Sequence, residues 1–180
     1  MEWGNVVAGQ RADPEQINKI GNQVAKYKGL RLARRVVLTE AVSVIEFNAD
    51  SDGNSLNSAM GGELSFYSGD NASVGTQAVA YIQLNGVTTN SYWTSSTNPS
   101  SSINVAWVGS SFSEFLVNIR IMQQNIAINS MYSQKNTSSG AQGVMGGGMF
   151  TPQSNVNRIK LFLSSGTFPA GTVVEWWERG

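Results

Sequence analysis

Two short acidic segments hold the side chains of this sequence that are best suited to chemistry. In NADSDGNS, the carboxylates Asp50 and Asp52 and the amide of Asn54 resemble the first ligands of a calcium-binding loop. Counted from Asp50, however, the glycine is the fourth residue instead of the sixth, and the twelfth is Gly61 instead of a glutamate. We therefore predict an Asx turn and no metal site, with an incidental calcium ion as the less favoured alternative.

The second acidic segment lies near the C-terminus, where Glu175 and Glu178 could form the carboxylate pair of a glycoside hydrolase. The two residues are three positions apart in a predicted strand, and a regular strand directs such residues to opposite faces. This spacing argues against joint catalysis.

The composition removes most other catalytic devices. The 180 residues include no histidine and no cysteine, which excludes His-dependent acid–base catalysis, thiolate nucleophiles and the usual zinc sites. No serine lies in a G-x-S-x-G motif, and the glycines at 143–148 lack the Lys-Ser/Thr pair of a phosphate-binding loop. We therefore predict no catalytic residue, no cofactor and no enzymatic activity.

Positive charge is concentrated near the N-terminus. Of the 12 basic residues, seven lie in the first 35 positions against three acids, whereas the rest of the chain has five bases and nine acids. Asp13 followed by Pro14 is typical of a helix start, and Gly29 of a helix end, so we predict a helix over 14–28. We assign residues 1–33 to an N-terminal helical arm and residues 34–180 to a β-domain.

The predicted helix has a narrow apolar stripe that cannot form a core alone. It either covers one end of the chain's own β-domain or binds a neighbouring chain, and both alternatives remain open. The arm has few aromatic residues for base stacking, so we expect no nucleic-acid partner. The residues that would dock the arm on a partner are Asp13, Ile17, Lys19, Ile20, Val24 and Tyr27.

After Arg34 the sequence alternates apolar and polar residues, as half-buried β-strands do, and polar segments separate the strands. This pattern is typical of an all-β sandwich or barrel. Trp107 and one of the adjacent Trp176 and Trp177 are expected in its core. Two low-complexity segments, 94–102 and 134–155, are predicted to be loops, and no apolar run is long enough for membrane insertion. The predicted strands are 34–49, 62–69, 79–84, 102–110, 113–122, 125–133, 159–163 and 173–178.

Aromatic residues beside polar loops are the candidates for a binding surface. Asn85-Gly86 is a strong hairpin signal, and the polar strand expected after it ends in two aromatic residues. A further aromatic residue precedes the second long loop. Aromatic rings flanked by amides and hydroxyls bind sugars or apolar patches of partners. The predicted ligand-binding or inter-subunit surface consists of Tyr92, Trp93, Met131 and Tyr132.

Three segments together resemble a family of bacteriophage virion proteins that carry a jelly-roll domain. They are the strand and NGVTTNSY turn (81–92), EFLVNIRI (114–121) and NRIKLFLSSGTFPAGTVVEW (157–176). Val87 stands where Asp is common in such proteins, and Trp176-Trp177 replaces a Leu-Tyr-Gly ending, so any inherited ligand is in question. The resemblance implies a jelly-roll β-sandwich in a tail, baseplate, fibre tip or capsid surface, generally as a homotrimer and without catalytic residues.

The combined expectation is a jelly-roll β-sandwich preceded by an N-terminal helical arm, in a non-enzymatic phage virion surface protein assembled in the host cytoplasm. Residues 1–33 would anchor it to other virion proteins, and the outward domain would bind a host receptor, a surface glycan, as a tail or fibre component. One alternative is a capsid or tail decoration protein with a structural role only, whose aromatic surface is buried between protomers. A further alternative is a carbohydrate-binding module.

Overall fold

The computed structural model describes residues 29–68, 77–94, 99–109, 113–123, 125–135, 140–149 and 151–179. Within these ranges the secondary structure consists of eleven β-strands. The described residues include no helix, and so none that could cross a membrane. The predicted all-β class is therefore confirmed for the described part of the chain. The helix predicted over 14–28, with all six docking residues of the arm, lies outside the described residues.

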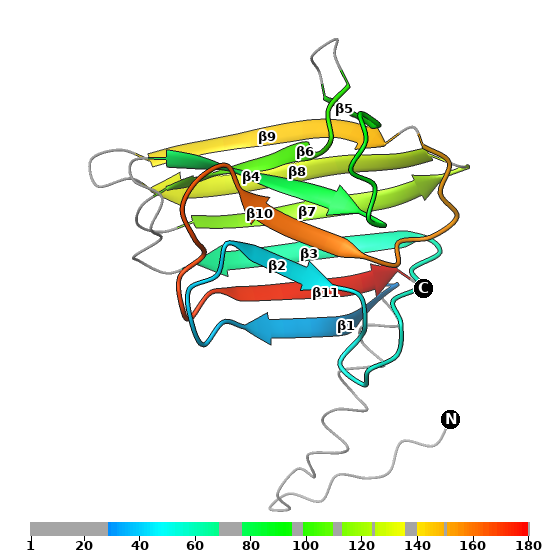
Figure 1. The fold of residues 1–180 in the computed structure, drawn as a ribbon, viewed down its shortest axis with the longest axis horizontal. Coiled ribbons are helices and arrows are strands. Elements are labelled where there is room, and N and C mark those ends of the chain that lie inside the picture. Colours follow the sequence, from blue (N-terminus) through cyan, green and yellow to red (C-terminus); the bar gives the residue numbers. More distant parts are fainter. Residues whose placement is uncertain are drawn as a thin grey trace, which may run out of the picture.

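The strands form two sheets that pack face to face (Figure 1). The seven-stranded sheet has the order β1-β11-β3-β7-β8-β9-β5, the four-stranded sheet has the order β2-β10-β4-β6, and neighbouring strands in both are antiparallel. In Figure 1 the larger sheet runs from β9 near the top to β1 at the bottom, and β2, β10 and β4 overlie it. The strands are β1 (Leu30–Val37), β2 (Val44–Phe47), β3 (Gly61–Ser68), β4 (Gln77–Leu84), β5 (Tyr92–Thr94), β6 (Ile103–Gly109), β7 (Ser113–Met122), β8 (Asn125–Lys135), β9 (Gly140–Met149), β10 (Ile159–Leu163) and β11 (Val173–Arg179).

The core lies between the two sheets and follows from the alternation of side chains along each strand. In β7, Phe115 and Val117 are buried while Glu114 and Leu116 are exposed. Phe66 of the neighbouring β3 stacks on Phe115, with the ring centroids 4.3 Å apart. Each fully buried side chain of this size contributes about 1.5–3 kcal/mol relative to exposure. Burial of the inner faces therefore holds the sandwich together.

The segment 34–49 forms two strands instead of the single strand predicted. β1 begins at Leu30, inside the 1–33 range assigned to the arm, and pairs with β11 in the larger sheet. β2 pairs with β10 in the smaller sheet. Between them, Val42 forms an isolated bridge to Phe168. Because the apolar residues continue through the crossover, alternation alone does not reveal that the chain changes sheets here.

The segment 134–155 was predicted to be a loop, and this prediction is wrong because it contains β9. β9 pairs with β8 along its whole length and with β5 at its end. Its glycines permit close packing: a Cβ at Gly143 would lie 2.6 Å from the Tyr132 ring, and one at Gly147 would collide with the Trp93 carbonyl oxygen and the Ile103 side chain. Here glycine serves the close approach of neighbouring groups, not a turn.

Asn85-Gly86 forms the predicted turn but not the predicted hairpin. Both residues have positive φ angles, 56° and 69°, and the Val87 N–H donates to the Leu84 carbonyl at 3.0 Å. However, β4 pairs with β6 and β10, and β5 joins the other sheet. The Asn85 side chain instead connects to the segment before β10, because its Oδ1 accepts from the Asn157 N–H at 2.9 Å.

Of the tryptophans expected in the core, Trp176 is buried and Trp107 is not. Trp176 is fully buried, as expected for one of the adjacent pair. Trp107 was predicted to be a core residue, but it is 36% exposed on the outer face of the four-stranded sheet. A strand can carry a large aromatic residue on either face, so the residue type of Trp107 did not show which face of β6 points into the core.

A pair of glycine substitutions in β9 tests the close-packing argument. Gly147→Ala should destabilise the domain by about 1–3 kcal/mol, because its Cβ meets backbone that must shift. Gly146→Ala is the matched control, since its Cβ would lie 3.2 Å from the movable Asn129 side chain. Thermal unfolding should show a lower melting temperature for Gly147→Ala only. Equal stability of the two variants would show that β9 does not pack as described.

Candidate ligand-binding surface

Strand alternation separates the four residues predicted to form a common surface. Trp93 and Met131 lie on the outer face of the seven-stranded sheet and are 37% and 62% exposed. Tyr92 is fully buried, and Tyr132 is half-buried and packs against the core. Adjacent residues in a strand face opposite sides. Of the four predicted residues, the outer surface therefore contains only Trp93 and Met131.

Tyr92 fixes the turn after β4. Its hydroxyl accepts from the Leu84 N–H at 2.7 Å and lies 3.1 Å from the carbonyl oxygens of Leu84 and Val87, to which it can donate. Burial raises the pKa of Tyr92 to about 12, and the hydrogen bond from Leu84 acts in the opposite direction. The Tyr92 ring is thus a structural side chain inside the sandwich, not part of an exposed ligand surface.

A row of apolar side chains crosses the outer face of the seven-stranded sheet. Leu116 of β7 lies opposite Met131 of β8, which lies opposite Val144 of β9. They are 41%, 62% and 75% exposed, respectively. An open hollow of about 890 Å³ is lined by this row together with Tyr67, Glu114 and Glu175, among others. We refer to Leu116, Met131 and Val144 as the apolar row.

A second hollow of about 1360 Å³ adjoins the first along β9 and β5. Gly148 lies between Trp93 of β5 and Ala127 of β8 in the ladder, so small residues separate the indole from the rest of the face. No described residue that lines this hollow is charged. We call it the Trp93 hollow; its lining consists of Trp93, Thr94, Asn104, Met122, Gln123, Asn125, Ile126, Ala127, Val144, Met145, Gly146, Gly147 and Gly148.

Sequence reasoning missed most residues of the Trp93 hollow. Residues 144–148 fell in the segment predicted to be a loop, because glycines removed the alternating pattern. Gln123 could have been found, since only two residues separate the predicted strands 113–122 and 125–133, as in a tight hairpin. Val144, by contrast, had no sequence signal of its own.

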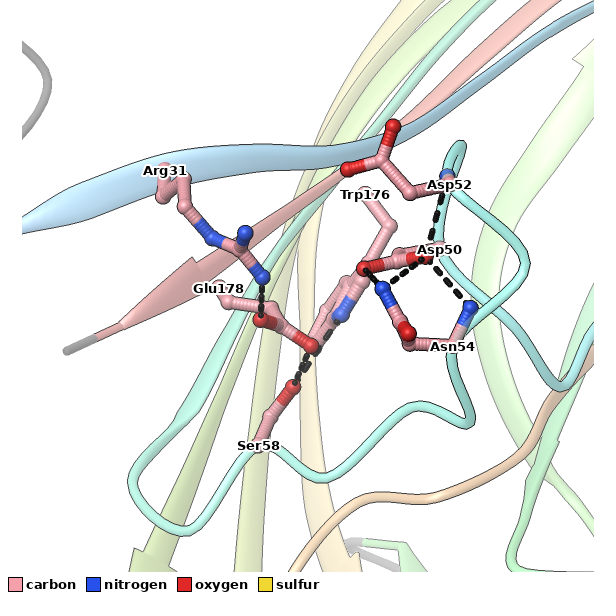
Figure 2. Close-up of polar contacts among 7 residues, drawn as sticks. All are labelled: Arg31, Asp50, Asp52, Asn54, Ser58, Trp176 and Glu178. Carbon is pink, nitrogen blue, oxygen red and sulfur yellow. Dashed lines mark hydrogen bonds and ion pairs between the residues drawn. The ribbon is translucent and has the colours of Figure 1, made fainter. Parts of the chain in front are cut away.

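The acidic segment at 50–54 forms the predicted Asx turn (Figure 2). Asp50 Oδ1 accepts from the Asp52 N–H at 3.0 Å and from the Asn54 N–H at 2.8 Å. Burial acts to raise the pKa of Asp50, but the hydrogen bonds from Asn54 and Asp52 outweigh it and lower that pKa. Within the described residues, no group of three acidic, histidine or cysteine side chains is placed to hold a metal ion.

The carboxylates of β11 have separate structural partners. Glu178 accepts from Ser58 Oγ at 2.8 Å and from Arg31 at 2.9 Å, and the Trp176 indole N–H in turn donates to Ser58 Oγ at 3.3 Å (Figure 2). Glu175 instead accepts from Ser65 Oγ at 3.3 Å. Each carboxylate therefore ties β11 to its neighbours.

Comparisons with known proteins give little further information. A scan against protein-family models finds no match, and a search of curated proteins finds none either. Among solved structures, a protein of unknown function from Shewanella oneidensis MR-1 is similar at 9% identity and a TM-score of 0.34, over 96% of this chain and 97% of that one.

The buried phenol of Tyr92 predicts a pH-dependent stability difference. Tyr92→Phe leaves the Leu84 N–H without its partner and should cost about 1–3 kcal/mol at neutral pH. The folded pKa of about 12 lies above the value of about 10 in an unfolded chain. The stabilisation from the neutral phenol is therefore fully present below pH 10 and is lost as the pH rises from 10 to 12.

Urea unfolding of both proteins across this pH window measures the difference. The gap in unfolding free energy between the native chain and Tyr92→Phe should narrow as the pH rises. Tyr81→Phe controls for hydroxyl loss at neutral pH, since Tyr81 lies half-buried on the outer face of the smaller sheet. A gap that stays constant up to pH 12 would contradict the buried phenol.

Proposed function

We propose that this chain is a non-enzymatic surface protein of a phage virion, a tail or fibre component whose domain binds a host-surface glycan. The Trp93 hollow carries the proposal, because it is concave, open to solvent and uncharged. Its lining combines an indole with the amides of Asn104, Gln123 and Asn125. Ligand sites typically join such apolar surface to a few polar groups that fix orientation.

The strand order supports a jelly roll as the finer description of the sandwich. Of the eight strands β1, β2, β3, β4, β6, β7, β10 and β11, four lie in each sheet. Successive members of this set change sheets, except β4 and β6, which pair with each other in the smaller sheet. Their orders, β1-β11-β3-β7 and β2-β10-β4-β6, are those expected of an eight-stranded jelly roll. In this proposal, β8, β9 and β5 are additions that extend one sheet and form the face with the hollow.

The placement of the two sheet edges supports an anchored, outward-facing domain. The arm leads into β1, at one edge of the seven-stranded sheet, and β5 lies at the other edge (Figure 1). The Trp93 hollow is lined by residues of β5 and β9 at that other edge. Residues 1–33 would bind another virion protein through their apolar stripe and positive charge. The hollow then lies at the edge opposite the attachment point.

A structural role in assembly is the second candidate, and the apolar row favours it. Outward positions of a solvated antiparallel sheet are ordinarily polar, whereas Leu116, Met131 and Val144 are exposed side by side. Contiguous exposed apolar residues mark protein–protein contacts. In a homotrimer, this row would be buried between protomers.

Trp93→Ala distinguishes the two functions. If the hollow binds the receptor, the variant should lose adsorption to host cells and glycan-array binding while its oligomeric state, measured by light scattering, stays unchanged. Trp107→Ala is the matched control, because Trp107 is exposed to a similar extent, 36% against 37%, but on the other sheet. Loss of the oligomer with Trp93→Ala, or equal loss of adsorption in both variants, would contradict receptor binding at this hollow.

The arm proposal has its own test. Ile20→Asp places a charge in the apolar stripe and should abolish incorporation into particles while leaving the thermal transition of the β-domain in place. Asn18→Asp, on a polar position two residues away, adds the same charge and should still incorporate. A large fall in melting temperature for Ile20→Asp would instead show that the helix belongs to the domain's own core.

A further inference from the structure

Gln123 has a backbone conformation that its side chain disfavours. Its φ angle is 58°, and among the described residues other than glycine only Asn85 shares a positive φ. Met122 pairs directly with Asn125, so the connection between β7 and β8 is a two-residue turn. Such turns favour Asn-Gly, which this chain uses at Asn85, whereas it has glutamine at both central positions here.

The two residues with positive φ differ in what their side chains do. Asn85 compensates for its conformation, since its amide donates to the Asn155 carbonyl at 2.7 Å and accepts from the Asn157 N–H at 2.9 Å. The exposed Gln123 side chain makes no hydrogen bond within the described part of the chain. A two-residue hairpin turn requires a positive φ, so the pairing of β7 with β8 imposes this conformation, and no side-chain hydrogen bond to the described residues adds to it. A residue other than glycine held in this conformation is a candidate for a functional role.

The position of Gln123 connects this strain to the Trp93 hollow. Gln123 and Asn125 lie on its lining at the end of the β7–β8 turn, together with Met122. A carboxamide both donates and accepts hydrogen bonds, which suits the hydroxyl groups of a sugar. No lysine or arginine is among the described lining residues, so a desolvated carboxylate or sulfate on a ligand would have no charged partner.

We propose that the Trp93 hollow binds a neutral oligosaccharide and that Gln123, held in its left-handed conformation by the β7–β8 turn, hydrogen-bonds that ligand. This inference rests on the proposed glycan-binding function and specifies its ligand class. The indole of Trp93 presents an apolar surface to a sugar ring, and the amides bind its hydroxyls. A volume of about 1360 Å³ exceeds that of typical small-molecule sites and leaves room for several sugar units.

Gln123→Gly separates binding from stability. The substitution relieves the backbone strain, so the melting temperature should rise, but it removes the amide, so affinity for neutral oligosaccharides should fall about tenfold. Asn85→Gly is the matched control at the other strained position. It loses the hydrogen bonds to the 155–158 segment, so it should be less stable yet bind with unchanged affinity.

The probes are neutral hexose oligosaccharides alongside sialylated and uronic-acid glycans of similar length, measured on an array and by calorimetry. Preferential binding of the neutral set, lost in the more stable Gln123→Gly, supports the inference. Preference for the acidic set, or unchanged affinity in Gln123→Gly, overturns it while leaving a glycan-binding function in place. If the native chain binds no saccharide and Trp93→Ala adsorbs normally to host cells, the inference and the proposed function both fail.

Discussion

The close approach of β9 to its neighbours is the constraint on which the rest of the structure depends. At Gly147 a Cβ would meet the Trp93 carbonyl and Ile103, and at Gly143 it would meet the Tyr132 ring. Glycine at these positions lets β9 pair with β8 and β5 while lying over the core, which extends the larger sheet to seven strands. On the outer face, Gly148 lies between Trp93 and Ala127, and these small neighbours leave that face hollow beside the indole.

Because side chains alternate along each strand, adjacent residues of that sheet lie on opposite faces. Tyr92 and Tyr132 point inward, where Tyr92 closes the turn after β4, while Trp93 and Met131 point outward from the same strands. A single short strand can therefore place one aromatic residue in the core and the next on the surface. The polar clusters at the other edge, around Asp50 and Glu178, hold loops and strands in place.

The fold was predictable from sequence where the apolar pattern was complete. β7, β8 and β10 matched the predicted strands closely because apolar residues recur at every second position in them. β9 was not predictable, because glycine contributes no hydrophobic signal and is more common in loops. For the candidate surface, Trp93 and Met131 are exposed, but Tyr92 is buried, since burial depends on strand phase and on which sheet β5 joins. The spacing of the strands predicted over 113–122 and 125–133 places Gln123 in a tight turn, but its position beside Trp93 depends on the pairing of β8, β9 and β5.

Amide hydrogen exchange in β9 tests the central claim most directly, because the seven-stranded sheet and both hollows require this segment to be a strand. Paired on one side with β8 and at its end with β5, its ladder-bonded amides should exchange slowly, at rates close to those of β8. Exchange across 140–149 as fast as in an unstructured loop would contradict the account, because residues 144–148, which line the Trp93 hollow, would then not form a strand.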